Sequence, residues 1–240
     1  MKIVQKLNAK KDMYNEKPVT IAFLGDSVTQ GCFECITNRD GSVETLVDYK
    51  SAYSTRIREL LNVLYPDVQI NIINSGISGD RTANALTRIE RDILPYSPDL
   101  CVVSFGLNDS SAGLQNLNAY SESVYGIVDK LISRGIEVVF LTQNGMNACV
   151  SRHLKDEQLI EIAENKMAIQ NDGILQQYMI TGSASAKRAG AVICDLSSVW
   201  QKLYKAGVDT TELLANYINH PIREWHYYMA VKLIETFFEI

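Results

Sequence analysis

The sequence predicts an α/β fold, a three-layer α/β/α sandwich around a five-stranded parallel sheet. Short apolar runs of strand length recur along the chain, and the segments between them have apolar residues at helical spacing. Strands that alternate with helices form βαβ units, which give a mostly parallel sheet with both faces covered. We find no internal repeat, low-complexity tract or linker in the 240 residues, so we expect a single domain over residues 1–240.

The first expected strand covers residues 19–24 and runs into Gly25-Asp26-Ser27, where the chain turns sharply into a helix. Residues 32–50 have weak periodicity, and we expect a loop over the sheet edge that carries Ser27. Apolar residues at helical spacing predict helices over residues 53–64 and 124–132. The remaining expected strands are residues 68–74, 100–106, 136–142 and 191–194, and the five strands together suit the flavodoxin-like order 2-1-3-4-5.

The C-terminal part of the chain is expected to be mainly helical. Residues 156–188 have a helical composition, with an expected break near residues 171–173 and an end around Gly182. Pro221 suits the first turn of a last helix, whose apolar pattern continues to Phe238. This leaves His220 on the loop just before that helix.

Composition and charge exclude several classes of protein. The hydrophobic fraction of 46% and the charged fraction of 21% are those of an ordinary water-soluble protein. The net charge of −5 gives no basic surface for nucleic acid, and no apolar run is long enough to span a membrane. Residues 1–18 lack the continuous apolar stretch of a signal peptide, so we expect a cytoplasmic protein.

The cysteines and histidines do not form a recognisable metal site. Cys32 and Cys35 make a single C-x-x-C without a second pair or a nearby histidine, and the remaining three of the five cysteines are scattered. The spacing of His220, Glu224 and His226 matches no common zinc motif. We therefore expect neither a metal nor a cofactor.

Polar residues follow several of the expected strands. Ser27 follows the first strand, "NSGISGDRT" follows the second, and "FGLNDSS" follows the third. Ser27 has two interpretations, a helix cap or a nucleophile at the carboxyl end of a strand. Asparagine side chains and glycine N–H groups are suitable donors to an oxyanion, and His220 lies on another loop. A serine, a histidine and such donors are the groups that acyl transfer requires.

These segments resemble the four sequence blocks of the SGNH hydrolases, the GDSL-type esterase and acylhydrolase superfamily. "GDSVTQG" resembles the first block, which implies that Ser27 is the nucleophile and that its N–H is one oxyanion donor. "NSGISGDRT" resembles the second and implies that Gly79 donates its N–H, with Gly76 as the alternative. "GLND" resembles the third and makes Asn108 the side-chain donor, and "NHP" resembles the last and makes His220 the general base.

The last block departs from the family pattern, which usually reads D-x-x-H. The position of the aspartate is Tyr217 here. A triad acid orients the histidine and stabilises the imidazolium, so its absence needs a replacement. A main-chain carbonyl near Tyr217 is the interpretation we favour, and a Ser–His dyad without a third member is another. A carboxylate from elsewhere is the remaining alternative, with Asp195, Asp209 and Glu212 as candidates, although Asp195 is better placed to cap the following helix.

Other polar residues have structural interpretations. By the same resemblance, Asp26 and Asp109 brace the loops of the site. Arg81 lies near the expected oxyanion loop, where contact with an anionic substrate and exposure to solvent are the two interpretations, and we favour exposure. His226 is expected to pack on the last helix, and His153 to lie on a surface loop.

The resemblance implies a serine ester hydrolase that acts on a small-molecule ester. The expected reaction removes short acyl groups from a carbohydrate or another small polar alcohol, with no nucleic acid and no membrane as partner. A lipase or thioesterase and a non-catalytic ligand-binding descendant are the alternatives. A flavin or nucleotide binder would share the fold, but the chain lacks G-x-G-x-x-G after the first strand and has no P-loop.

Overall fold

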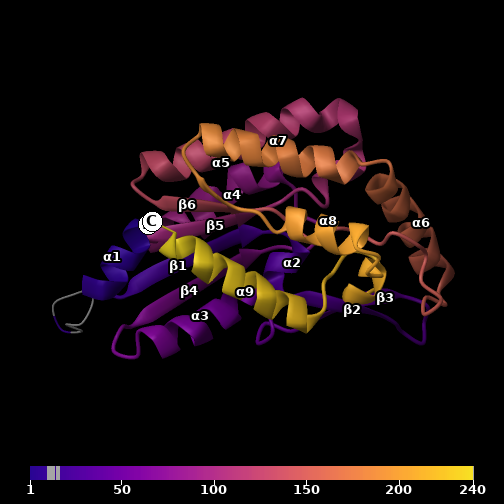
Figure 1. Ribbon diagram of the computed structural model, residues 1–240, viewed down its shortest axis with the longest axis horizontal. Coiled ribbons are helices and arrows are strands. Elements are labelled where there is room, and N and C mark those ends of the chain that lie inside the picture. The colour runs from indigo at the N-terminus through magenta and orange to yellow at the C-terminus, as the bar shows by residue number, and fades with distance from the viewer. Residues whose placement is uncertain (10–13, 15–16, 240) are drawn as a thin grey trace.

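The central sheet has five parallel strands in the order β4-β1-β5-β6-β7 (Figure 1). The computed structural model describes residues 1–9, 14 and 17–239, so part of the N-terminal segment 1–18 lies outside the described residues. When these five strands are numbered 1 to 5 along the chain, their order across the sheet is 2-1-3-4-5, which confirms the predicted topology. The strands are β1 (Val19–Gly25), β4 (Ile70–Gly76), β5 (Leu100–Ser104), β6 (Glu137–Leu141) and β7 (Val192–Cys194).

Helices cover both faces of this sheet, as the prediction required. Figure 1 shows α4, α5 and α7 on one side of the sheet, and α3 and α9 on the other. The main helices are α1 (Lys2–Ala9), α3 (Tyr53–Leu64), α4 (Thr82–Asp92), α5 (Leu117–Ser133), α6 (Glu157–Asn171), α7 (Ile174–Arg188), α8 (Ser197–Lys205) and α9 (Arg223–Phe238). Short elements complete the fold: α2 (Ser27–Gln30) and the 3₁₀ turns η1 (Leu94–Tyr96), η2 (Asp109–Ala112), η3 (Leu114–Asn116) and η4 (Thr210–Leu213).

The middle strands are buried on both faces, which explains their continuous apolar sequences. In β5 every residue is buried, and in β1 only Thr20 is partly exposed. Cys101 on β5 and Cys194 on β7 are core residues, as predicted. No helix in the described part of the chain has the length and apolar character needed to cross a bilayer.

The expected loop over residues 32–50 is wrong. The chain forms an antiparallel hairpin there, β2 (Cys32–Thr37) and β3 (Val43–Val47), which pair with each other and not with the main sheet. The turn between them contains Gly41, whose φ of 83° is left-handed, and Asp40, whose carboxylate accepts from the N–H of Ser42. The alternation is weak in the sequence because much of this hairpin is exposed on both faces.

Two other expectations about helix ends also need correction. Helix α7 does not end around Gly182 but continues to Arg188. Gly182 occurs inside the helix because a Cβ there would collide with the hydroxyl oxygen of Tyr120, on the neighbouring α5. Pro221 precedes Ile222, the N-cap of α9, and so lies just before the first turn. The expected break near residues 171–173 is confirmed, because α6 ends at Asn171 and α7 begins at Ile174.

The loops that carry polar residues meet at the carboxyl ends of three neighbouring strands, β4, β1 and β5. Gly25 at the end of β1 pairs with Gly76 of β4 on one side and with Ser104 of β5 on the other. The loops that follow these strands carry Ser27, Gly79 and Asn108. The sheet therefore brings the three sequence blocks to one edge, where ligands of open α/β sheets bind.

Candidate active site

Ser27 is the first residue of α2, directly after the end of β1. Asp26 is the N-cap of this helix, and its Oδ1 accepts from the N–H of Val28 at 3.0 Å. The capping role therefore belongs to Asp26, and the Ser27 hydroxyl is free for another partner. A Cβ on Gly76 would overlap the main chain at Thr29 and Gln30, so this glycine lets α2 rest directly on the end of β4.

His220 contacts Ser27 through one ring nitrogen and the main chain through the other. Its Nε2 lies 3.0 Å from Ser27 Oγ, and its Nδ1 lies 3.0 Å from the carbonyl oxygen of Phe33. A carbonyl only accepts, so Nδ1 carries the proton and Nε2 is left to accept from the serine hydroxyl. Burial lowers the pKa of His220 to about 4, against a smaller opposing effect of the Phe33 carbonyl, and the ring is neutral at pH 7.

The group that accepts from Nδ1 is a main-chain carbonyl, but it is not near Tyr217 in the sequence. It belongs to Phe33 on β2, in the segment that we expected to be a loop. Tyr217 has a left-handed backbone with φ 57°, and its ring stacks on His153 with centroids 5.0 Å apart. The residue at the usual position of the acid therefore packs against His153 rather than against His220.

The three alternative carboxylates have other partners. Asp195 accepts from the N–H of Ser198 at 3.0 Å, in the first turn of α8, although the N-cap position of this helix is Leu196 and not Asp195 as expected. Asp209 accepts from the N–H of Thr211 at 3.0 Å and caps η4. Glu212 lies 3.7 Å from Nε2 of His153. Each of the three side chains is thus bound to a group other than the His220 ring.

The loop that carries His220 is organised by Asn216, which sequence reasoning missed. Its buried Oδ1 accepts from three main-chain N–H groups, those of Ile218 at 3.0 Å and of Asn219 and His220 at 2.9 Å. The carbonyl of His220 in turn accepts from the N–H of Ala215 at 2.7 Å. Asparagine is a frequent turn residue, and its place four residues before the histidine was the available signal.

The expected oxyanion donors lie on neighbouring loops. Asn108 donates one amide hydrogen to the carbonyl of Asp80 at 3.0 Å, which places its amide beside Gly79 and leaves its second hydrogen. Gly79 has φ 78°, a conformation that suits glycine. Gly76 is the weaker candidate, because its N–H already donates to Asn74 Oδ1 at 3.0 Å. Within the described residues, the N–H groups of Ser27 and Gly79 have no intramolecular acceptor.

Two buried side chains hold these loops together, and neither was singled out from the sequence. Gln143 donates to Asp26 at 2.9 Å and accepts from the N–H of Leu107 at 2.8 Å, so it links the serine loop to the loop of Asn108. Burial raises the pKa of Asp26 to about 7, although both of its hydrogen bonds favour the carboxylate. The contacts agree with the expectation that Asp26 braces the site.

Arg88 is the second of these side chains. Its guanidinium lies 2.7 Å from the carboxylate of Asp80 and donates to the carbonyls of Ser75 and Gly25. Asp109 braces the same loop, since its Oδ1 accepts from both the N–H and the hydroxyl of Thr82. Arg88 was hidden in the sequence as one of several charged residues of α4, whereas Arg81 is exposed, as expected.

The remaining histidine and the cysteines have structural surroundings. His226 is fully buried between Phe33 and Tyr53, and its Nδ1 accepts from the N–H of Tyr53 at 3.2 Å. Burial lowers the pKa of His226 to about 3. All five cysteines have free thiols. The described residues contain no group of three or more side chains suited to hold a metal ion.

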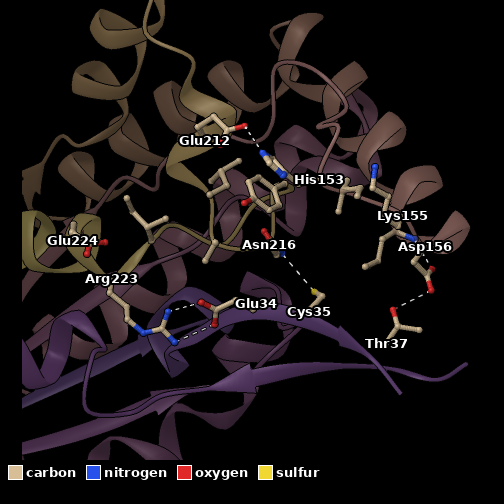
Figure 2. Close-up of a pocket in the computed structure, with 16 residues that line it drawn as sticks. Glu34, Cys35, Thr37, His153, Lys155, Asp156, Glu212, Asn216, Arg223 and Glu224 are labelled. Atoms are coloured by element: carbon tan, nitrogen blue, oxygen red, sulfur yellow. Dashed lines mark hydrogen bonds and ion pairs between the residues drawn. The ribbon is translucent and has the colours of Figure 1, made fainter. Parts of the chain in front are cut away.

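We call residues 214–222, the segment that carries His220, the histidine loop. A groove lies beside it, between the β2–β3 hairpin and residues 212–224 (Figure 2). Its cavity volume is about 580 Å³. We call it the hairpin groove. Figure 2 shows charged and polar side chains on its walls, with Glu34 and Arg223 on the hairpin side and Glu212 and His153 opposite, and the exposed lining as a whole is about equally polar and apolar. Tyr217 and Asn216 of the histidine loop also line it.

Comparisons with known proteins identify a family that the chain matches. The model of the GDSL-like Lipase/Acylhydrolase family matches residues 23–226. An acetylxylan esterase of Geobacillus stearothermophilus is 32% identical over 89 residues, a match that spans 37% of this chain and 39% of that enzyme.

Solved structures share the fold. The crystal structure of an acetylxylan esterase from Geobacillus stearothermophilus has a TM-score of 0.65 at 19% identity and covers 92% of this chain and 95% of that one. A two-domain esterase active on acetylated mannans has a TM-score of 0.66 at 17% identity and covers 98% of this chain and 52% of that one. The family match extends from the end of β1 to the first turn of α9, so the chain belongs to the GDSL-like lipase and acylhydrolase family.

Proposed function

We propose that the protein is a serine carboxylic ester hydrolase that removes short acyl groups, acetyl above all, from carbohydrates. The observation that carries the proposal is the contact of 3.0 Å between Ser27 Oγ and Nε2 of a neutral His220, whose Nδ1 is bound to the Phe33 carbonyl. A hydroxyl paired with an oriented neutral imidazole is an activated nucleophile. The matched family of lipases and acylhydrolases supports this reading.

The proposed reaction has two halves. In the first, Ser27 Oγ attacks the ester carbonyl carbon while its proton moves to His220 Nε2. The N–H groups of Ser27 and Gly79 and the amide of Asn108 stabilise the oxyanion of the tetrahedral intermediate. The intermediate then breaks its bond to the alcohol oxygen, which takes the proton from Nε2 and leaves. In the second half, a water molecule loses a proton to Nε2 and its oxygen attacks the carbonyl carbon of the acyl-enzyme. The resulting intermediate breaks its bond to Ser27 Oγ, which takes the proton back from Nε2, and the carboxylic acid leaves. The reaction needs no cofactor.

The substrate class rests on the relatives and on the hairpin groove. The matched relatives are an acetylxylan esterase and an esterase active on acetylated mannans. In the proposed reaction the alcohol takes its proton from His220 Nε2, so the alcohol side of the substrate lies next to the histidine loop. The hairpin groove flanks this loop, and its mixed lining offers charged and polar side chains for the hydroxyl groups of a sugar and apolar surface for its ring. This favours a carbohydrate ester over the substrate of a lipase or thioesterase.

An active-site label tests the function directly. The purified protein is incubated with a fluorophosphonate, and its intact mass is measured. We expect one adduct on wild type and on Ser133→Ala, a control at an exposed serine of α5, and none on Ser27→Ala. Ser27→Ala should retain less than about 1% of the wild-type kcat on p-nitrophenyl acetate with an unchanged melting temperature. Wild type that gains no adduct and hydrolyses neither p-nitrophenyl acetate nor acetylated xylo-oligosaccharides would instead be a non-catalytic binding protein.

A further inference from the structure

The acceptor of the His220 Nδ1 proton lies on a structurally weak element. Phe33 belongs to the two-stranded β2–β3 hairpin, which is not hydrogen-bonded to the main sheet, and a hairpin of this size is at best marginally stable alone. A carboxylate on the histidine loop would move with the histidine, whereas this carbonyl depends on the placement of a separate segment. The buried ring of Phe33 packs against His226 and anchors the start of β2, and a contact from the segment of His220 would fix the main chain of Phe33 relative to the imidazole.

The pairing of the hairpin is irregular at Phe33. Cys32 pairs with Val47 and Cys35 pairs with Thr45, so Phe33 and Glu34 stand opposite a single residue of β3. Such a bulge removes a residue from the regular ladder and redirects its main-chain groups. The bulge explains how the Phe33 carbonyl is available to His220 rather than to β3.

Arg223 binds the hairpin beside this bulge. Its Nη1 and Nη2 donate to the two carboxylate oxygens of Glu34 at 2.5 and 3.1 Å, an interaction visible in Figure 2. Its Nε donates to Asp48 at 3.2 Å, just after β3, and its Cζ lies 4.3 Å from the centroid of the Phe33 ring. The planar fork of arginine suits this combination of a bidentate pair and ring stacking.

The same short segment carries both the histidine and the arginine. Arg223 is the first residue of α9 and follows His220 by three positions. The hydrogen bond from Ile222 N–H to the Leu213 carbonyl fixes this segment on its other side. One rigid connection therefore controls the position of the imidazole and the position of its acceptor.

We propose that Arg223, together with Glu34 and Asp48, is a positioning residue that takes over the orienting role of the missing triad acid. We call the three side chains the Arg223 clamp. The clamp does not touch the reacting atoms, and it acts by holding the Phe33 carbonyl at His220 Nδ1. Its hydrogen bonds hold the pKa of Glu34 below the usual range and raise that of Arg223, so both side chains are charged over the working pH range.

The partial exposure of the clamp distinguishes a role in orienting His220 from a role in stabilising the fold. The side chains of Arg223 and Glu34 are 34% and 40% exposed, and ion pairs with such exposure contribute little to folding stability. A clamp that serves orientation should therefore affect turnover far more than the melting temperature. The inference rests on the proposed function for its kinetic test and on the tautomer of His220 for an independent one.

The test uses Arg223→Met, Arg223→Lys, Glu34→Gln and the double variant Glu34→Gln/Arg223→Met, with Lys232→Met as the control. Lys232 makes an ion pair of 2.5 Å with Glu235 on the same helix, α9, outside the candidate site. We expect Arg223→Met to lower kcat on p-nitrophenyl acetate by about tenfold to a hundredfold, the cost of a misplaced catalytic group, with KM within about twofold. The melting temperature should change by less than about 4 °C.

The other variants refine the expectation. Arg223→Lys should lose less activity than Arg223→Met, because it keeps the charge without the fork. The double variant should be no slower than Arg223→Met, because the two side chains act as one unit. Lys232→Met should keep the wild-type kcat. In the ¹⁵N spectrum of the imidazoles, Arg223→Met should move part of the His220 population from the Nδ1–H to the Nε2–H tautomer.

Three results would overturn the clamp in an active enzyme: an unchanged kcat in Arg223→Met, a change confined to KM, or a loss of kcat accompanied by a melting temperature lower by more than the stated limit. An unchanged His220 tautomer would overturn it as well. If wild type shows neither esterase activity nor phosphonylation of Ser27, the proposed function fails, and the tautomer measurement alone decides on the clamp.

Discussion

The carbonyl of Phe33 differs from a triad acid in charge as well as in origin. A carbonyl orients the imidazole as a carboxylate does, but it has no full negative charge to stabilise the imidazolium that forms when His220 takes the serine proton. Burial also lowers the pKa of His220 to about 4, which makes the ring a weaker base than a free histidine. In the proposed mechanism this site should turn over more slowly than a complete triad.

Restoring the family spacing by Tyr217→Asp should not improve catalysis. The left-handed backbone of residue 217 places the present side chain against His153, and the Nδ1 proton already has an acceptor. We expect kcat within about twofold of wild type, far from the roughly 10⁴-fold effect of a working triad acid. The measurement is steady-state kinetics on p-nitrophenyl acetate, with the fold checked by circular dichroism.

The amide variants Asp195→Asn, Asp209→Asn and Glu212→Gln complete this comparison. Each should cost less than about tenfold in kcat, because each carboxylate is bound to a helix N-terminus or to His153. A gain of tenfold or more in Tyr217→Asp would contradict the assigned role of the Phe33 carbonyl. A loss near 10⁴-fold in one amide variant would identify that carboxylate as the third member.

At the level of elements, the sequence predicted correctly the strands that are buried on both faces of the sheet. Strands such as β5 read as continuous apolar runs because both of their faces are covered. The β2–β3 hairpin was missed because its exposed side chains weaken the alternation, and its bulge interrupts the register. A main-chain carbonyl was the favoured Nδ1 acceptor, but its location on β2 was missed, since no side-chain motif indicates the position of a main-chain atom.

The hairpin groove gives a prediction about substrate choice. Tyr217 offers an aromatic surface in this groove, and Tyr217→Asn removes the ring while asparagine tolerates the left-handed backbone. We expect KM for acetylated xylo-oligosaccharides to rise by about threefold to tenfold, as for the loss of one aromatic contact. KM for p-nitrophenyl acetate, which is too small to occupy the groove, serves as the matched control and should stay constant. An equal rise in KM for both substrates would mean that the hairpin groove does not bind the carbohydrate part of the substrate.

For the whole molecule, the site depends on contacts between distant parts of the chain. Ser27 and His220 are separated by 193 positions, and the acceptor carbonyl is 187 positions from the histidine. The order of the sequence blocks and the parallel sheet indicated that these loops would converge. The network of Gln143 and Arg88 could not be predicted, because its partners become neighbours only after the sheet is assembled.

Burial of titratable groups also gives the whole molecule a pH dependence. His220 and His226 have lowered pKa values, about 4 and about 3, so the unfolded chain binds more protons than the folded one as pH falls below about 6.5. Stability contributed by these groups is therefore complete above pH 6.5 and is lost toward lower pH. Asp26, with its pKa raised to about 7, acts in the opposite sense between pH 7 and about 4, and burial also raises the pKa of Asp109.

His226→Gln isolates one of these contributions, because the other groups are common to both proteins. Glutamine retains an oxygen that can accept from the N–H of Tyr53 but does not titrate. We expect the unfolding free energy of wild type, measured in urea, to fall between pH 6.5 and pH 5 by about 1 to 2 kcal/mol more than that of the variant, because the slope approaches about 1.4 kcal/mol per pH unit only once the unfolded imidazole is mostly protonated. Between pH 7.5 and pH 8.5 both proteins should change in parallel, since the imidazole is neutral in both the folded and the unfolded state. If the unfolding free energies of the two proteins also change in parallel below pH 6.5, His226 binds its proton equally well in the folded and the unfolded state. The core around Phe33 and Tyr53 would then admit water.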